Sequence, residues 1–171
     1  MALSTYLLAA AAGVGLLLLG TQILPGRVTV TRSTTVPAQP EAILARLSST
    51  EGFQTINPYR NTTPDLKIEA FGPATGVGAG FRFDGGGTKG TQTVSALDST
   101  RVVYDIDLGA MGKPVQTVTA RPTATGSEVT WTMEADLGRN PIARVMGLFM
   151  EGMVGPTLEQ GLANLSKIES L

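Results

Sequence analysis

Two stretches of the chain alternate between apolar and polar side chains, and this alternation constrains the fold more than any other feature. The apolar members are Val102, Tyr104, Ile106 and Leu108 in the first stretch, and Val129, Trp131, Met133 and Ala135 in the second. Successive side chains of a strand point to opposite faces, so each stretch predicts a strand with one apolar and one polar face. Such a sheet is antiparallel, and something must cover its apolar side.

Five further runs have strand character, which brings the expected sheet to seven strands. They are separated by Gly, Pro, Asp and Ser residues at hairpin spacing, and they cover residues 27–36, 66–72, 78–84, 90–97 and 114–122. Two short helices are expected between the first two strands. Pro40 begins the first helix, Ser49 or Thr50 caps the second, and Asn57-Pro58 ends it.

The C-terminal segment is predicted to form a helix that covers the apolar face of the sheet. Asn140 and Pro141 form a helix start, and apolar residues then recur every three or four positions as far as Ile168. We therefore expect one long helix, kinked at Pro156. Its glycines favour close approach to the sheet or to a ligand, and they are Gly147, Gly152, Gly155 and Gly161.

The N-terminus predicts a membrane anchor over residues 1–26. These residues carry no charged side chain, and the apolar run from Tyr6 to Leu24 can reach across a hydrocarbon core of about 30 Å as a helix. A cleaved signal peptide is the alternative, but the segment lacks the basic start and the cleavage site of one. Arg27 and Arg32 follow the span and favour the cytoplasmic side for the domain.

Composition excludes several classes of function. The chain contains neither cysteine nor histidine, which rules out disulfides, thiolate or imidazole metal sites and a Ser-His-Asp triad, so we expect no metal or cofactor. A net charge of −1 gives no reason to expect nucleic acid as a partner. Glycine-rich stretches near residues 76–80 and 85–87 are interpreted as turns. The loop 109–112 is either a cavity gate or lipid contact, or an ordinary hairpin loop.

The order of these elements resembles the helix-grip domains of the START-like superfamily, also called SRPBCC, and in particular its bacterial polyketide cyclase/dehydrase-like branch. The resemblance covers residues 27–171. It is carried by Thr31-Arg32-Ser33, Val36-Pro37-Ala38, Ile56-Asn57-Pro58-Tyr59, Phe71-Gly72-Pro73, Gly76-Val77-Gly78-Ala79 and Gly90. The expected fold is therefore α+β: an N-terminal transmembrane helix, then a domain with a seven-stranded antiparallel sheet, two short helices and a long C-terminal helix.

The resemblance implies a ligand cavity between the sheet and the long helix. The residues expected to line it are Tyr59, Phe81, Phe83, Tyr104, Ile106, Trp131, Met133, Met146, Phe149, Met150 and Met153. Methionine packs against varied shapes, which suits a hydrophobic guest. Tyr104 and Trp131 each need a hydrogen-bond partner when buried, and this makes them candidates to orient the guest. A solid core built from the same side chains is the alternative.

Three classes of function remain open. The first is a membrane-anchored protein that binds or transports a lipid or another hydrophobic small molecule. The second is a cyclase or dehydratase, for which Tyr104, Tyr59 and Arg82 are the candidate catalytic groups. The third is a protein-interaction module that docks through the apolar helix half from Ile142 to Val154.

Overall fold

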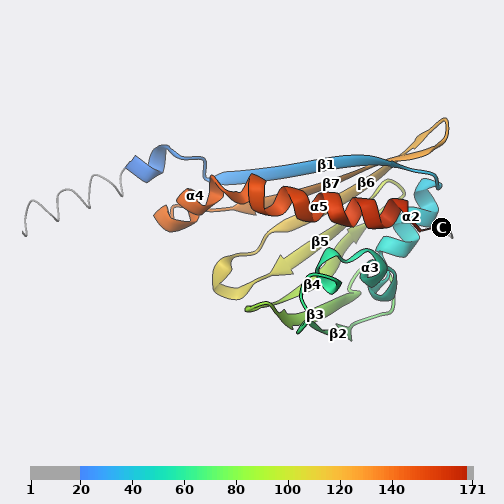
Figure 1. Ribbon diagram of the computed structural model, residues 1–171, viewed down its shortest axis with the longest axis horizontal. Coiled ribbons are helices and arrows are strands. Elements are labelled where there is room, and N and C mark those ends of the chain that lie inside the picture. The colour runs from blue at the N-terminus through green and yellow to red at the C-terminus, as the bar shows by residue number, and fades with distance from the viewer. Residues whose placement is uncertain (1–19, 169–171) are drawn as a thin grey trace, which may run out of the picture.

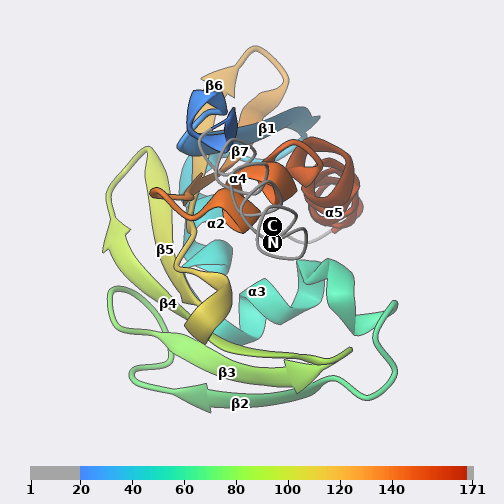
Figure 2. The same cartoon turned by 90° about the vertical axis from the view of Figure 1, so that its left-hand side faces the viewer.

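A seven-stranded antiparallel sheet forms the body of the domain in the computed structural model, which describes residues 20–168. Its strands are β1 (Arg27–Val36), β2 (Lys67–Phe71), β3 (Gly80–Gly85), β4 (Thr88–Leu97), β5 (Arg101–Asp107), β6 (Val115–Thr123) and β7 (Gly126–Asp136). Strands β2 to β7 follow one another as hairpins, and β1 closes the order as the neighbour of β7. The sheet curves strongly, and Figure 2 shows it wrapping around the helices.

Within residues 20–168, four α-helices lie on the concave side of the sheet (Figure 1). They are α2 (Pro40–Leu47), α3 (Thr50–Ile56), α4 (Pro141–Gly147) and α5 (Met150–Ser166). Three short 3-10 helices complete the fold, η1 (Thr21–Ile23), η2 (Pro58–Arg60) and η3 (Gly109–Met111). Helix α5 runs along β1 and β7, whereas α2 and α3 fill the far end of the curve. The fold is thus the predicted α+β helix grip.

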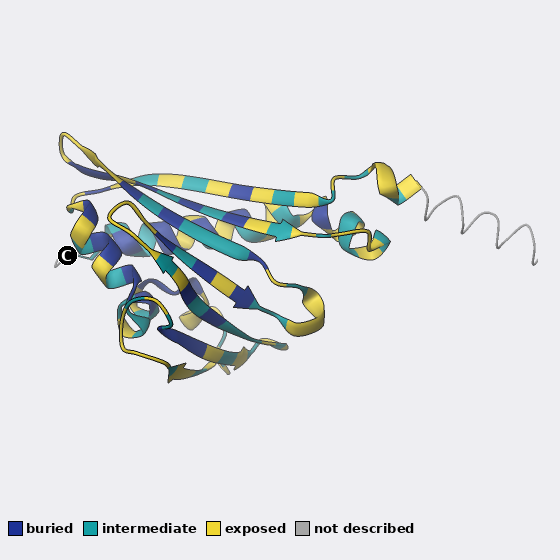
Figure 3. Cartoon of the chain, turned by 180° about the vertical axis from the view of Figure 1, so that it is seen from behind, coloured by how far each residue is buried: buried dark blue, intermediate teal, exposed yellow. Residues whose placement is uncertain are grey.

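The predicted alternation of inward and outward side chains along β5 and β7 is confirmed, because every second residue in the middle of each strand is buried. Val102, Tyr104 and Ile106 are buried on β5, and Val129, Trp131 and Met133 are buried on β7. Figure 3 shows the corresponding change between buried and exposed residues along the strands. The apolar side of the sheet therefore faces the helices.

Helix starts follow the predicted caps. The Ser49 hydroxyl accepts a hydrogen bond from the backbone N–H of Gly52 at the start of α3. The Asn140 side chain accepts from the N–H groups of Ile142 and Ala143 at the start of α4, where Pro141 occupies the first helical position. Each cap satisfies N–H groups that have no partner within the helix.

Three of the four C-terminal glycines allow the close approach that the sequence predicts. Gly155 lies against the guanidinium group of Arg32, Gly161 against the ring of Trp131, and Gly147 against Leu137. The exception is Gly152, where an added methyl group would meet no atom within 4 Å. Arg32 also forms ion pairs with Glu151 and Glu159, at 2.7 Å and 2.5 Å, so β1 and α5 are joined by charge as well as by packing.

The C-terminal segment differs from the single helix predicted for it. It divides into α4 and α5 at Leu148 and Phe149, whose N–H groups bond to carbonyls three residues earlier instead of four. The division comes directly after Gly147. Glycine has the lowest helix propensity of all residues except proline, so the helix is weakest there. Helix α5 then continues through Pro156.

The predicted anchor falls almost entirely outside the described residues, which begin at Gly20. Among residues 20–168, no helix has both the length and the hydrophobicity to cross a membrane.

Candidate ligand-binding site

A single side chain from α3 occupies the centre of the concave side. The ring of Phe53 lies 5.7 Å from Phe81 on β3, 5.3 Å from Tyr104 on β5 and 5.9 Å from Trp131 on β7, measured between ring centroids. Two of these contacts are edge-to-face, which is a favourable geometry for aromatic pairs. The seven-residue helix α3 thus places the Phe53 ring against three strands of the sheet.

The polar atoms of Tyr104 and Trp131 are satisfied within the protein. The Tyr104 hydroxyl donates to the carbonyl of Leu47 at 2.8 Å, and the Trp131 indole N–H donates to Oε1 of Gln116 at 3.0 Å. Burial raises the pKa of the Tyr104 hydroxyl well above its usual value. Both residues have the partners that the sequence analysis required, and those partners belong to the protein itself.

Gln92 on β4 is one of four buried polar residues in the described part of the chain, with Ser48, Asn57 and Ser127. Gln92 is only 7% exposed, and its Nε2 forms no hydrogen bond to another atom of residues 20–168. An unsatisfied buried donor costs about 1–3 kcal/mol. Gln92 borders a space of about 10 Å³ between α3 and the strands β3 to β5. That volume is close to the minimum for one water molecule.

Seven of the eleven predicted lining residues are buried or half-buried on the concave side. Phe81, Tyr104, Trp131 and Met133 are buried, and Phe83 and Met150 pack at the edge of the same core. Ile106, a seventh, is 8% exposed on the inward register of β5. The concave side is therefore walled by the apolar side chains that the sequence indicates, and it is nearly filled.

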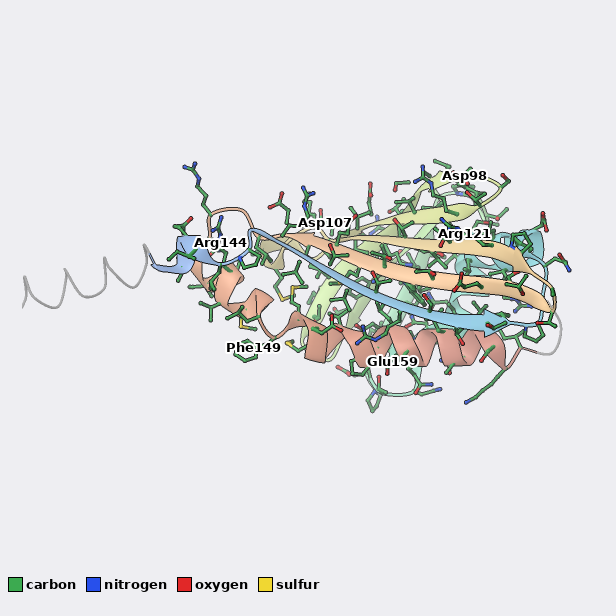
Figure 4. The ribbon with its side chains drawn as sticks, turned by 90° about the horizontal axis from the view of Figure 1, so that it is seen from above. Asp98, Asp107, Arg121, Arg144, Phe149 and Glu159 are labelled. Atoms are coloured by element: carbon green, nitrogen blue, oxygen red, sulfur yellow. The ribbon has the colours of Figure 1, made fainter. Side chains whose placement is uncertain are left out.

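The other four predicted lining residues are exposed, and the prediction was wrong to place them on an interior wall. They are Tyr59, Met146, Phe149 and Met153, and the last two are 59% and 62% exposed. Met146 and Phe149 belong to α4 and to the junction that follows it, which lie beyond the main length of α5. Figure 4 shows Phe149 pointing away from the sheet.

The candidate catalytic groups do not converge on the interior. Tyr59 lies on η2 at the surface, and Arg82 is exposed on β3, where it stacks over Phe71 and lies 3.9 Å from Glu69. Tyr104 is buried with its hydroxyl engaged. Within residues 20–168, no three Asp or Glu side chains are grouped so that they could hold a metal ion.

An open polar depression of about 620 Å³ lies between α3, η2 and the C-terminal end of α5. It is lined by Glu51, Gln54, Thr55, Asn57, Arg60, Asn61, Asn164 and Lys167. Its lining carries both signs of charge, and it shares no residue with the predicted site.

Sequence reasoning did not assign Phe53, Gln92 or Gln116 to the site. A signal was present for Gln92, because it shares a strand face with the buried Val94 two residues later. Phe53 was expected in a short helix, but no local pattern says how far such a side chain reaches.

Comparison with known proteins identifies the family of this chain. Residues 27–168 match the family described as "Polyketide cyclase / dehydrase and lipid transport". The chain belongs to this family. This result agrees with the helix-grip resemblance drawn from the sequence. No curated protein sequence matches the chain.

Solved structures support the same polyketide cyclase and lipid transport fold. The KanY protein has a TM-score of 0.63 at 21% identity, covering 84% of this chain and 97% of KanY. The di-domain ARO/CYC StfQ from the steffimycin biosynthetic pathway has a TM-score of 0.62 at 12% identity, covering 86% of this chain and 51% of StfQ. Norcoclaurine synthase from Thalictrum flavum, in complex with dopamine and hydroxybenzaldehyde, has a TM-score of 0.62 at 14% identity. The match covers 88% of this chain and 93% of the synthase. At these identities the likeness concerns the fold.

Proposed function

We propose that this protein binds and transports a hydrophobic small molecule or lipid, and that its N-terminal segment anchors it in a membrane as a single-pass protein. The observation that carries the proposal is Gln92, a buried amide whose Nε2 has no partner within residues 20–168 and which borders the same small space as Phe53 and Phe81. Binding sites for small molecules are mostly apolar, with a few polar groups that orient the ligand. The family's lipid transport members agree with this class of ligand.

The guest would occupy the space that Phe53 now fills. Helix α3 is short, and its Phe53 ring separates Phe81 and Tyr104 from Trp131. Outward movement of α3 would withdraw the ring and join its volume to the small space beside Gln92. The guest's acceptor, a carbonyl or carboxylate oxygen, would then take the Nε2 hydrogen bond of Gln92, while its apolar part would contact Ile106 and Met133.

A cyclase or dehydratase activity has less support. Such an enzyme needs a polar group that can exchange a proton with the substrate inside the cavity. The Tyr104 hydroxyl is instead engaged by the carbonyl of Leu47, while Tyr59 and Arg82 lie at the surface. Binding without reaction is therefore the function that we favour.

Trp131 supplies the test, because it is the only tryptophan in the chain and lies beside Phe53. Full-length protein in detergent would be titrated with a dansyl-labelled fatty acid. A bound probe should quench Trp131 and emit by energy transfer. Native mass spectrometry of the protein from its host membrane would then identify the natural guest.

A matched pair of variants locates the guest. Val94 borders the space beside Gln92, whereas Val103 lies on the other face of the neighbouring strand. Val94→Phe should weaken probe binding by about tenfold, because its ring would occupy space that the guest needs, and Val103→Phe should not. Phe53→Leu, which removes volume, should strengthen binding. Equal affinity in all three variants, or no energy transfer from Trp131, would contradict the proposal.

A further inference from the structure

An exposed apolar surface lies at one end of the domain, on α4 and the first turn of α5. We call it the apolar end, and it consists of Ile142, Val145, Met146, Leu148, Phe149 and Met153, each of them exposed. From Pro141 to Met150 the only charged side chain is Arg144. A soluble protein rarely leaves such a group of side chains in water without a partner.

The apolar end is fastened to the point where the N-terminal segment enters the domain. The Arg144 guanidinium donates to the carbonyls of Gln22 at 2.7 Å and Leu24 at 3.0 Å, which belong to η1 and the residue after it. Its Nε donates to the carbonyl of Gly138, and the Gln22 side chain donates to the carbonyl of Arg139. Helix α4 therefore lies within hydrogen-bond distance of the chain that follows residue 20.

The sequence that precedes η1 indicates a lipid bilayer as the partner of the apolar end. Residues 1–19 are uncharged and predominantly apolar, and the segment ends at Gly20, directly before η1. If it spans a bilayer, η1 emerges at the membrane surface, and α4 is held at the same level. An apolar helix face at that level enters the boundary between headgroups and acyl chains.

We infer that the apolar end inserts into the surface of the phospholipid bilayer that holds the N-terminal segment. The inference rests on the membrane anchoring in the proposed function. Arg139 supports it, because its side chain is exposed beside α4 and forms no ion pair within residues 20–168, leaving it free to meet anionic headgroups. The loop between β5 and β6 lies at the same end of the molecule (Figures 1 and 2), and it carries the exposed Met111 on η3.

The absence of cysteine makes the test clean, because one introduced thiol can be labelled alone. The full-length variants Phe149→Cys and Met153→Cys would carry the environment-sensitive fluorophore NBD and be reconstituted in vesicles of phosphatidylethanolamine and phosphatidylglycerol. Ser99→Cys is the control, since Ser99 is exposed in the β4–β5 turn next to Asp98, at the opposite end of the domain in Figure 4.

The expected result is a blue-shifted emission from positions 149 and 153, which lipids carrying a nitroxide on the acyl chain quench strongly. Position 99 should show neither effect. A blue shift without quenching would mean that protein covers the surface, either a second copy or residues 1–19, and would overturn the inference. Emission typical of water at position 149 would also overturn it.

Vesicle flotation separates this inference from the proposed function. Chains that float with the vesicles but show no quenching at positions 149 and 153 contradict only the insertion of α4. Chains that do not float contradict the membrane anchoring itself, and the insertion with it. Comparison of the urea midpoints of the labelled variants checks that each remains folded.

Discussion

Gly161 on α5 lies against the indole ring of Trp131 on β7, so closely that a Cβ added to the glycine would be 2.6 Å from Cζ3 of the ring. The helix can approach the sheet at this point only because residue 161 has no side chain. The same approach holds Trp131 beneath α5, where its N–H reaches Gln116.

Gly161→Ala should therefore destabilise the protein. The added methyl group must move either the helix or the ring, at a cost of about 1–3 kcal/mol. Gly152→Ala is the matched control on the same helix, because its Cβ would meet no atom within 4 Å. That variant should gain up to about 1 kcal/mol from helix propensity. Urea denaturation measures both, and a loss of the same size in both would contradict this account.

Gln92→Met should stabilise the protein, in contrast to most changes in a core. It removes the buried Nε2 that has no partner, and the expected gain is about 1–3 kcal/mol in the free energy of unfolding. Gln116→Met on β6, the strand beside β7, should instead lower the free energy of unfolding, because it leaves the Trp131 N–H without an acceptor. If Gln92 orients the guest, the stabilised variant should also bind the dansyl probe less tightly.

Tyr104→Phe should cost only about 0.5–1.5 kcal/mol of stability, because it removes one hydrogen bond to the Leu47 carbonyl and keeps the ring. Binding of the dansyl probe should be unchanged. Thermal unfolding and titration of the probe measure the two effects. A substrate whose turnover is lost in this variant while its binding is retained would instead give Tyr104 a catalytic role.

Asp98 should make stability depend on acid pH. Hydrogen bonds from Thr100 and Arg101 in the β4–β5 turn lower the pKa of its carboxyl from 3.8 to about 2. A lowered pKa in the folded state means that the stabilisation is complete above about pH 4 and is lost as the pH falls towards about 2. The difference in urea midpoint between wild type and Asp98→Asn should shrink over this range.

Glu128→Gln is the control for that measurement. It also removes one exposed negative charge, but the Glu128 side chain makes no hydrogen bond or ion pair in the described part of the chain. A midpoint difference for Asp98→Asn that stays constant between about pH 5 and pH 2 would refute the assignment.

Arg144→Met should release η1 from α4. The three carbonyls that its guanidinium now engages would lose their donor, and the backbone amides around residues 21–26 should exchange hydrogen faster. Arg139→Met is the control, because only the carbonyl of Arg139 takes part in this contact. Mass spectrometry after hydrogen exchange measures both, and equal exchange in the two variants would contradict the role of Arg144.

The strands were predictable because alternation is a local pattern with one physical meaning. Burial of Tyr104 and Trp131 follows directly from it. The C-terminal helices were harder, because a helical period tells which residues share a face but not whether that face meets a sheet or something outside the domain. Leu158 and Leu162 pack on the sheet, whereas Met146 and Phe149 continue the same period and are exposed.

The centre of the site was not predictable for a different reason. Phe53 fills the interior because α3 is placed across from three strands that are distant in sequence. Its position depends on the curvature of the whole sheet, which no short segment encodes. The orphaned Nε2 of Gln92 likewise becomes visible only when every neighbouring acceptor is known.

The bonds from Arg144 to Gln22 and Leu24 have a consequence for how the domain is presented. A domain joined to its preceding chain by the backbone alone could swing about that joint in any direction. Here a second attachment, made by a side chain some 120 positions later, removes that freedom. If residues 1–19 are held in a membrane as we propose, α4 should stay beside the chain that emerges from it, with the β4–β5 turn at the opposite end of the domain.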